Sequence, residues 1–232
     1  MDSFVVTCEH GGNRVPARCA RLFRGHRALL DSHRGFDPGA MVMAKALAGA
    51  LRAPLVTSTV SRLVVDLNRS IGHPQCLSAA TRGAPPQLRT WIVEQYYRPY
   101  RAEVEHLVRR SVARGRRVIH VSSHSFTPEL NGKVRCADVG LLYDPARRSE
   151  AELCARWKAS LAAIAPEIRV RRNYPYAGKG DGLTTALRRC FPCRAYVGVE
   201  LEVNQRIVFA DRRRWTALRD ALIESLGAAC AG

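Results

Sequence analysis

Short apolar runs alternate along this chain with longer segments in which apolar residues recur every three or four positions. Six of the short runs predict strands, at 4–8, 55–58, 117–123, 139–143, 168–172 and 195–203. The longer spacing predicts helices over 38–51, 86–114, 149–165 and 211–226. The segment 62–67 is predicted to be a further extended piece. Strands that alternate with helices predict an α/β fold, a sheet with helices on both faces.

Residues at the ends of these elements refine the prediction. Asp37 and Pro38 precede the helix over 38–51, as expected for an N-cap and a first helical residue. Pro99 predicts a kink within 86–114. Polar and glycine-rich segments at 72–86, 127–137 and 174–181 are predicted loops. In α/β folds the loops at strand ends carry the functional sites.

The length of 232 residues is enough for one sizeable core, which predicts a single domain over 1–232. A hydrophobic content of 47% and a charged content of 25% are typical of a folded protein. No stretch reaches the roughly 18 apolar residues of a membrane span. The first residues lack the basic and apolar segments of a secretory signal, so we expect a cytoplasmic protein.

The formal net charge of +17 raises the question of a nucleic-acid partner. The chain has 37 basic residues, only four of them lysines, and they are scattered along the sequence instead of clustered among aromatic residues. This distribution does not favour nucleic-acid binding. A positive field also suits a small anionic substrate, which is the partner we expect.

Two histidines occupy positions where a metal ligand could lie. His10 follows the first predicted strand and precedes Gly11 and Gly12, and His124 lies at the end of another strand. Two imidazoles and an acid can hold zinc while leaving a place for water. The acid could be Asp37 or Glu9, although Glu9 neighbours His10 on a strand end and should point elsewhere.

Other residues have the chemistry of substrate binding and proton transfer. Arg69 offers a planar fork that binds a carboxylate, Asn68 adds a donor, and Arg62 is a second possible contact. Glu200 and Glu202 share one face of an otherwise apolar strand. Because buried carboxylates are costly without partners, this pair predicts a lined cavity.

Taken together, five short motifs resemble those of the N-formylglutamate amidohydrolase family, and through it the zinc carboxypeptidase-like superfamily. They are Glu9-His10-Gly11-Gly12-Asn13, Val65-Asp66-Leu67-Asn68-Arg69, Ser123-His124-Ser125-Phe126, Asp181-Gly182-Leu183-Thr184-Thr185 and Leu201-Glu202-Val203-Asn204-Gln205-Arg206. The likeness runs from about residue 5 to 226. Each motif is short, and their order along the chain makes the resemblance specific.

The resemblance implies a three-layer α/β domain with a mixed central sheet, of the phosphorylase/hydrolase-like and zinc carboxypeptidase-like type. It also implies one zinc ion per chain, held by His10 and His124. Carboxypeptidases carry a glutamate three residues after the first histidine, where this chain has Asn13. We therefore expect Asp37 as the third ligand, with Glu9 and Asn13 as alternatives.

The activity implied is hydrolysis of the amide of an N-acyl amino acid, foremost N-formylglutamate to glutamate and formate. Motif register makes Glu202 the general base, and a different register would choose Glu200. Asn68 and Arg69 would bind the substrate carboxylate, and Arg62 or Arg188 a second carboxylate or the oxyanion. Two alternatives stay open: a carboxypeptidase-like hydrolase acting on another N-acyl amino acid or a small peptide, and a basic nucleic-acid-binding protein without catalysis. We expect no membrane partner, and the sequence leaves the oligomeric state open.

Overall fold

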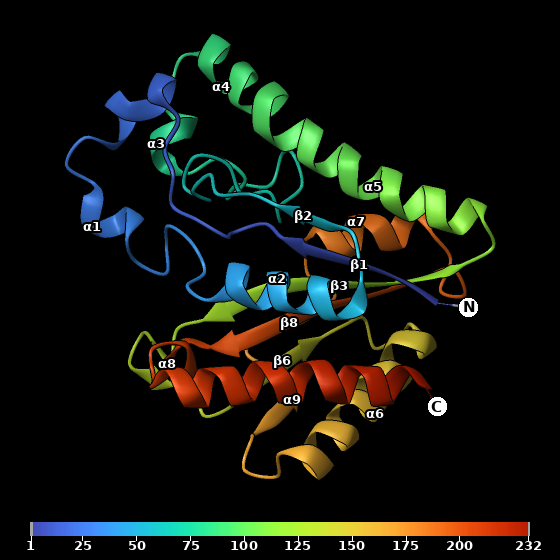
Figure 1. Ribbon diagram of the computed structural model, residues 1–232. Coiled ribbons are helices and arrows are strands. Elements are labelled where there is room, and N and C mark those ends of the chain that lie inside the picture. The colour runs from blue at the N-terminus through green and yellow to red at the C-terminus, as the bar shows by residue number, and fades with distance from the viewer. Residues whose placement is uncertain (1, 232) are drawn as a thin grey trace.

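A computed structural model describes residues 2–231 and is built on a six-stranded sheet with the order β2-β1-β3-β8-β6-β7 (Figure 1). Strands β2 (Leu55–Thr57), β1 (Asp2–Cys8), β3 (Arg117–Phe126) and β8 (Tyr196–Asn204) are parallel. Strand β6 (Val139–Leu142) is antiparallel to β8, and β7 (Val170–Arg172) is parallel to β6. The expected α/β fold with a mixed sheet is therefore confirmed.

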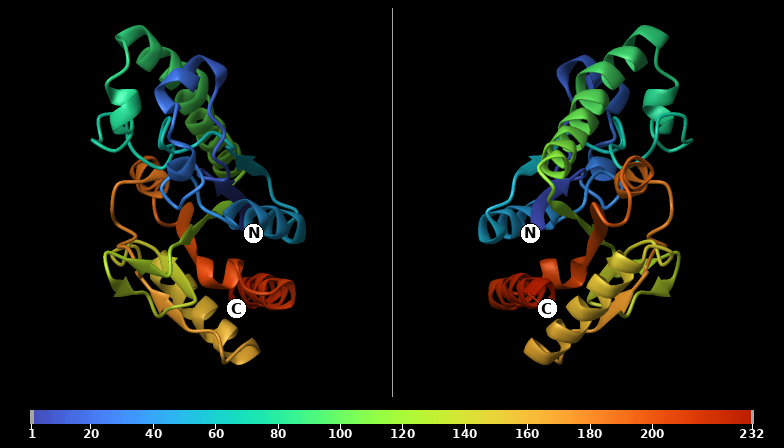
Figure 2. Two further views of the ribbon diagram at one scale, coloured as in Figure 1. Left: turned by 90° about the vertical axis from the view of Figure 1, so that its left-hand side faces the viewer. Right: turned by 90° about the vertical axis from the view of Figure 1, so that its right-hand side faces the viewer.

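Helices cover both faces of the sheet (Figures 1 and 2). Helices α2 (Ala40–Leu51), α6 (Arg148–Ile164) and α9 (Arg212–Ala231) contribute to one core, and α5 (Arg98–Ala113) and α7 (Leu183–Cys190) to the other. Strand side chains alternate between the two cores, as on β3, where Ile119 joins the first and Val118 the second. The described residues also form short elements, namely η1 (Ala17–Phe23), α1 (Arg27–Leu30), α3 (Ala79–Arg82), β4 (Glu129–Leu130), β5 (Lys133–Val134) and α8 (Gln205–Val208).

Toward its carboxyl edge, the sheet face that carries α5 and α7 becomes polar. On β3 the residues of this face include Ser122 and His124, and their partners on β8 are Glu200 and Glu202. Residues paired in a parallel register point to the same side of the sheet, so these four side chains share one face. This polar patch lies next to the apolar core of α5 and α7 and is the floor of the candidate site.

The segment 62–67 is not extended, and its prediction is wrong. Val64 donates its N–H to the carbonyl of Ser61 at 2.9 Å, which closes a turn. Val64, Val65 and Leu67 are buried in the core of α5 and α7 and not in the sheet. A run of apolar, β-branched residues favours burial, but burial does not require a strand. Here the run is buried against the helices on one face of the sheet.

The N-cap predicted at Asp37 is also wrong. Helix α2 begins at Ala40, with Gly39 as its N-cap residue. The backbone carbonyl of Asp37 accepts a hydrogen bond from the Ala40 N–H at 3.2 Å. Because the side chain of Asp37 makes no capping bond, its carboxylate is left for contacts with distant residues.

The helix is irregular just before Pro99, in the region where a kink was predicted. The predicted helix over 86–114 consists of α4 (Pro86–Ile92), a π-helical turn at Val93–Tyr97 (η2) and α5. Proline has no N–H, so the α-helical bond from Pro99 to the carbonyl of Gln95 cannot form. The N–H of Arg98 bonds instead to the carbonyl of Val93, five residues back.

None of the helices within residues 2–231 has the length and apolar character that crossing a membrane requires.

Candidate active site

Three side chains from distant segments meet at the carboxyl ends of β1 and β3. His10 follows β1, His124 lies in β3, and Asp37 precedes α2. The Asp37 Oδ2 atom is 2.9 Å from His124 Nδ1 and 3.3 Å from His10 Nδ1. All three residues are buried, and one ligand atom from each lies within 4.8 Å of the others. Imidazole nitrogens and a carboxylate oxygen at this separation could hold one divalent cation.

A buried carboxylate holds the outer nitrogen of each imidazole. His10 Nε2 lies 2.7 Å from Asp66 Oδ1. His124 Nε2 lies 3.0 Å from Glu9 Oε2 and 2.9 Å from Ser122 Oγ. An Nε2 proton donated outward leaves each Nδ1 free to face the space beside Asp37. Ligating histidines in metal proteins are commonly oriented by such a carboxylate.

The carboxylate behind His124 is itself held in place. The Tyr100 hydroxyl on α5 donates to Glu9 Oε1 at 2.9 Å, and the Ser122 hydroxyl donates to Glu9 Oε2 at 2.6 Å. Burial alone would raise the pKa of Glu9, but His124 and the hydroxyl groups of Ser122 and Thr7 outweigh it and hold the pKa well below its usual range. Glu9 is therefore an anion that fixes the plane of the His124 ring.

Negative charge exceeds positive charge in this cluster. Arg62 lies between two carboxylates, with NH2 at 2.8 Å from Asp66 Oδ2 and NH1 at 3.3 Å from Asp37 Oδ1. Burial disfavours the imidazolium of His124, yet the hydrogen bonds that His124 donates to Asp37 and Glu9 raise its pKa well above the usual range. Arg62 thus contacts two of the three buried carboxylates, Asp37 and Asp66 but not Glu9, and the surrounding carboxylates raise the pKa of both histidines. Such an excess of buried negative charge favours a bound cation, so the residues present fit a metal.

A cavity of about 210 Å³, called here the inner cavity, opens beside these residues. Its lining includes His10, Asp37, His124, Arg62, Asn68, Arg69, Glu200, Glu202 and residues of the loop 173–182. Glu202 Oε2 and Arg69 Nε are buried and have no hydrogen-bond partner among residues 2–231. An unpaired acceptor and an unpaired donor on one cavity indicate a polar ligand.

The two glutamates of β8 differ in their surroundings. Burial raises the pKa of Glu202 to about 8, with contributions from Asp37 and Glu200. Glu200 Oε1 instead accepts a hydrogen bond from the Thr184 hydroxyl at 2.8 Å. Of the two, Glu202 is the carboxylate whose pKa lies near neutral pH, which suits proton transfer.

Asn68 and Arg69 also line the inner cavity, and Asn68 Nδ2 lies 3.5 Å from His124 Nε2. Asn68 Oδ1 accepts the N–H of Leu183 at the start of α7 at 2.7 Å. Arg69 NH1 donates to the carbonyl of Asp181 at 2.6 Å. Ser70 donates its N–H and hydroxyl to the Asp181 carboxylate at 2.9 and 2.5 Å. These bonds tie the loop 173–182 to the segment that carries Arg69.

Glycines let this loop lie flat against β6. A Cβ atom on Gly140, the residue paired with Glu202, would come within 2.0 Å of the Tyr174 carbonyl oxygen. A Cβ on Gly178 would come within 2.0 Å of the Tyr143 nitrogen. The absence of these side chains brings the loop over Glu202 and closes the inner cavity on that side.

Three residues considered from the sequence lie elsewhere. Arg188 is buried, pairs with Glu150 at 3.0 Å, and donates to the carbonyls of Gly178 and Gly198, so it does not line the inner cavity. Asn13 Nδ2 donates to Asp31 in an exposed contact. Glu9 lies behind His124, on the side away from Asp37.

Four residues of the site were not predicted to have a role there. Asp66 belongs to the motif Val65-Asp66-Leu67-Asn68-Arg69, and Ser122 lies two residues before His124 on the same strand face. The sequence therefore offers a pattern from which both could have been predicted. Tyr100 has the spacing of an ordinary core residue of a helix, and no pattern links it to Glu9. Tyr176, on the loop 173–182, lines the inner cavity from a segment predicted only as a loop.

Several solved structures are similar to this one. The structure is similar to the gene product Atu2144 of Agrobacterium tumefaciens, with 28% identity, a TM-score of 0.85, and 99% of this chain and 91% of that chain covered. It also resembles N-formylglutamate amidohydrolase from Ralstonia eutropha JMP134, with 19% identity, a TM-score of 0.70, and 100% and 94% covered. N-acetylmuramoyl-L-alanine amidase from Clostridium difficile 630 matches at 11% identity with a TM-score of 0.50 and 100% and 98% covered. The last two likenesses show the fold alone.

No curated protein matches the chain. The model of the family described as N-formylglutamate amidohydrolase matches residues 2–209, which is most of the chain. The resemblance expected from the five motifs is thereby confirmed: the chain belongs to the N-formylglutamate amidohydrolase family of amide-bond hydrolases.

Proposed function

We propose that this protein is a zinc-dependent amidohydrolase that cleaves the amide bond of an N-acyl amino acid. The observation that carries the proposal is the meeting of His10, Asp37 and His124 beside a cavity that also holds the unpartnered atoms Glu202 Oε2 and Arg69 Nε. The family suggests N-formylglutamate as the reference substrate, with glutamate and formate as products.

The proposed metal ligands are His10, Asp37 and His124. Two imidazoles and a carboxylate are a donor set that suits zinc. When bound, zinc supplies Lewis acidity, which polarises a carbonyl group and makes water more acidic. Asp66 and Glu9 hold the rings of His10 and His124 in the orientation in which Nδ1 faces Asp37.

Arg69 is the proposed anchor of the substrate carboxylate. Its guanidinium is fixed by the carbonyl of Asp181, while Nε has no hydrogen-bond partner in the part of the chain that the structure describes, so a donor is available to a carboxylate in the inner cavity. Asn68 lines the same wall. A substrate held there by its carboxylate has its amide in the cavity that His10 and His124 also line, which lowers the entropy cost of the reaction.

Glu202 is the proposed base. Water adds to the acyl carbon and gives a proton to Glu202, which passes it to the amide nitrogen as the carbon–nitrogen bond breaks. The products are the carboxylate of the acyl group and the free amino acid. The carboxylate is suited to this exchange because burial raises its pKa to about 8 and Oε2 has no hydrogen-bond partner among the described residues.

Metal content tests the proposal together with hydrolysis. We expect about one zinc per purified chain, and loss of both metal and N-formylglutamate hydrolysis in His10→Ala, His124→Ala and Asp37→Asn. His106→Ala is the matched control, because His106 is exposed on α5 and far from these residues in the sequence. Metal is measured by elemental analysis and hydrolysis by release of free glutamate.

A wild-type protein that binds no divalent metal would overturn the zinc assignment. A metal-loaded protein inert toward N-formyl-, N-acetyl- and N-succinylglutamate would overturn the N-acylglutamate assignment.

Substitution of Arg69 by lysine keeps the charge and removes the planar fork. We expect the kcat/KM for the N-acyl amino acid to fall roughly 10- to 100-fold, mainly through KM, because a hydrogen bond to a charged group contributes about 1.5–3 kcal/mol. Steady-state kinetics measure the effect. Arg98→Lys, which alters an exposed arginine paired with Glu94, should leave KM unchanged. An unaltered KM in Arg69→Lys would show that another group binds the carboxylate.

A further inference from the structure

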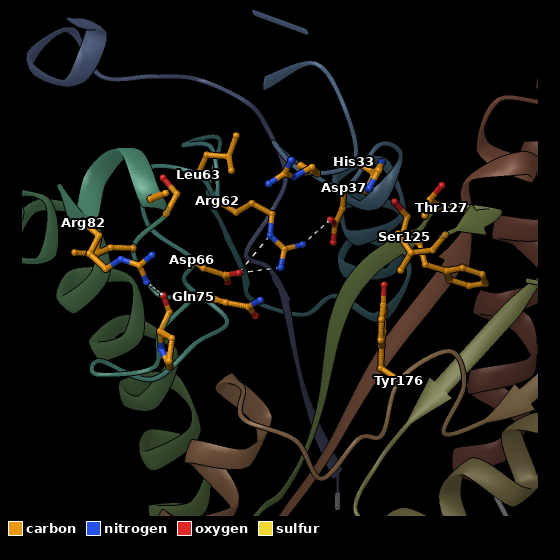
Figure 3. A pocket seen from close by; sticks show the side chains of 17 residues that line it. His33, Asp37, Arg62, Leu63, Asp66, Gln75, Arg82, Ser125, Thr127 and Tyr176 are labelled. Atoms are coloured by element: carbon orange, nitrogen blue, oxygen red, sulfur yellow. Dashed lines mark hydrogen bonds and ion pairs between the residues drawn. The ribbon is translucent and has the colours of Figure 1, made fainter. Parts of the chain in front are cut away.

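A second and larger cavity opens from the candidate site. This outer cavity measures about 440 Å³ and shares Asp37, Arg62, Ser125 and Tyr176 with the inner cavity. Figure 3 shows Arg62 between Asp66 and Asp37, where the two cavities meet, and Tyr176 on the other side. A molecule in the inner cavity can therefore extend past Asp37 without leaving the protein.

The outer cavity has an apolar part. Leu63 from the turn between Ser61 and Val64, Leu77 from the segment before α3 and Leu130 from β4 contribute to its lining, and each is partly buried. These residues offer contact to a short hydrocarbon chain. A formyl group, which is one carbon and its oxygen, is too small to reach them.

The outer cavity is also cationic. Arg34 and Arg82 line it, both are exposed, and neither has an ion-pair partner within residues 2–231. Arg82 uses only NH1, on the carbonyl of Pro74. The acidic residues of the lining, Asp37 and Asp66, are already paired with Arg62 and His10. The positive charge that faces this space is available to an anion.

We infer that the outer cavity binds the acyl part of the substrate, and that this part is a chain of several carbons ending in an anionic group. The inference rests on the proposed function and extends it from formyl to half-amides of dicarboxylic acids. Arg69 lines the inner cavity and does not line the outer one. With the amino-acid carboxylate at Arg69, the acyl group on the far side of the amide faces the outer cavity.

Three substrates separate size from charge. N-formylglutamate has the smallest acyl group, N-butanoylglutamate has a neutral four-carbon chain, and N-succinylglutamate has a chain of the same length ending in a carboxylate. We expect the zinc-loaded wild-type protein to show a kcat/KM for the succinyl substrate at least about tenfold above that for the butanoyl substrate. In the double variant Arg34→Ala/Arg82→Ala this ratio should fall to near one.

The control is Arg110→Ala/Arg114→Ala, which removes two exposed arginines at the end of α5 and should keep the wild-type ratio. A succinyl-to-butanoyl ratio near one in the wild type, or a ratio unchanged by Arg34→Ala/Arg82→Ala, overturns the anionic subsite. Hydrolysis of the formyl substrate alone overturns the subsite and leaves the proposed function standing. Hydrolysis of none of the three overturns both.

Discussion

Glu202→Gln is expected to lower kcat for N-acyl amino acid hydrolysis roughly 10²- to 10⁴-fold, the range typical of a lost general base. The amide of glutamine has the shape of the carboxylate but cannot take the proton from water. Because Glu202 is buried with an unpartnered oxygen, the neutral amide should not destabilise the fold. Steady-state kinetics give kcat, and elemental analysis should show zinc at the wild-type level.

Parallel variants assign the effect. Glu200→Gln should lose less activity, since Glu200 Oε1 is engaged by Thr184 and its environment differs from that of Glu202. Glu103→Gln, on the exposed face of α5, controls for removal of a charge. Full activity in Glu202→Gln with a large loss in Glu200→Gln would assign the base to Glu200.

Arg188→Met is expected to lower the free energy of unfolding by about 3–5 kcal/mol, the usual cost of breaking a buried ion pair. Arg188 Nε lies 3.0 Å from Glu150 Oε1, and both side chains are almost fully buried. The substitution also leaves the carbonyls of Gly178 and Gly198 without their donor. Urea denaturation followed by circular dichroism measures the change.

An exposed pair of the same chemistry provides the comparison. Arg148→Met removes the contact with Glu152 on the surface of α6 and should change the unfolding free energy by less than about 1 kcal/mol. The two roles considered for Arg188 give opposite results. A substrate-binding arginine would leave stability unchanged and raise KM, and that outcome would contradict the structural role.

Much of the sheet can be predicted from the sequence because its strands are continuous apolar runs. His10 and His124 follow or end such runs, and parallel pairing of β1 with β3 places both at one edge of the sheet. The pair Glu200 and Glu202 is likewise visible in the alternation of β8. The positions of these residues are fixed by the strands that carry them, so their proximity follows from the order of the strands in the sheet.

The remaining contacts depend on tertiary structure that local patterns do not encode. Asp37 has the sequence signature of an N-cap, yet the helix begins at Ala40 and the carboxylate faces the histidines. The run around Val64 has the composition of a strand, yet it is a turn that places Asp66 against His10. Arg188 was predicted to contact the substrate, and no local pattern shows that it instead pairs with Glu150, 38 positions away.

The walls of the two cavities differ in origin, and this difference has a practical consequence. Glu202 and His124 stand on central strands, whereas Leu63 and Leu77 stand on irregular segments and Leu130 on a two-residue strand of a small ribbon. Irregular surface segments tolerate replacement far better than the strands of a core. Protein engineers could therefore exchange the segments of Leu77 and Leu130 to accept new side groups. The turn of Leu63 has to be kept, because it also carries Arg62 and Asp66, which contact Asp37 and His10.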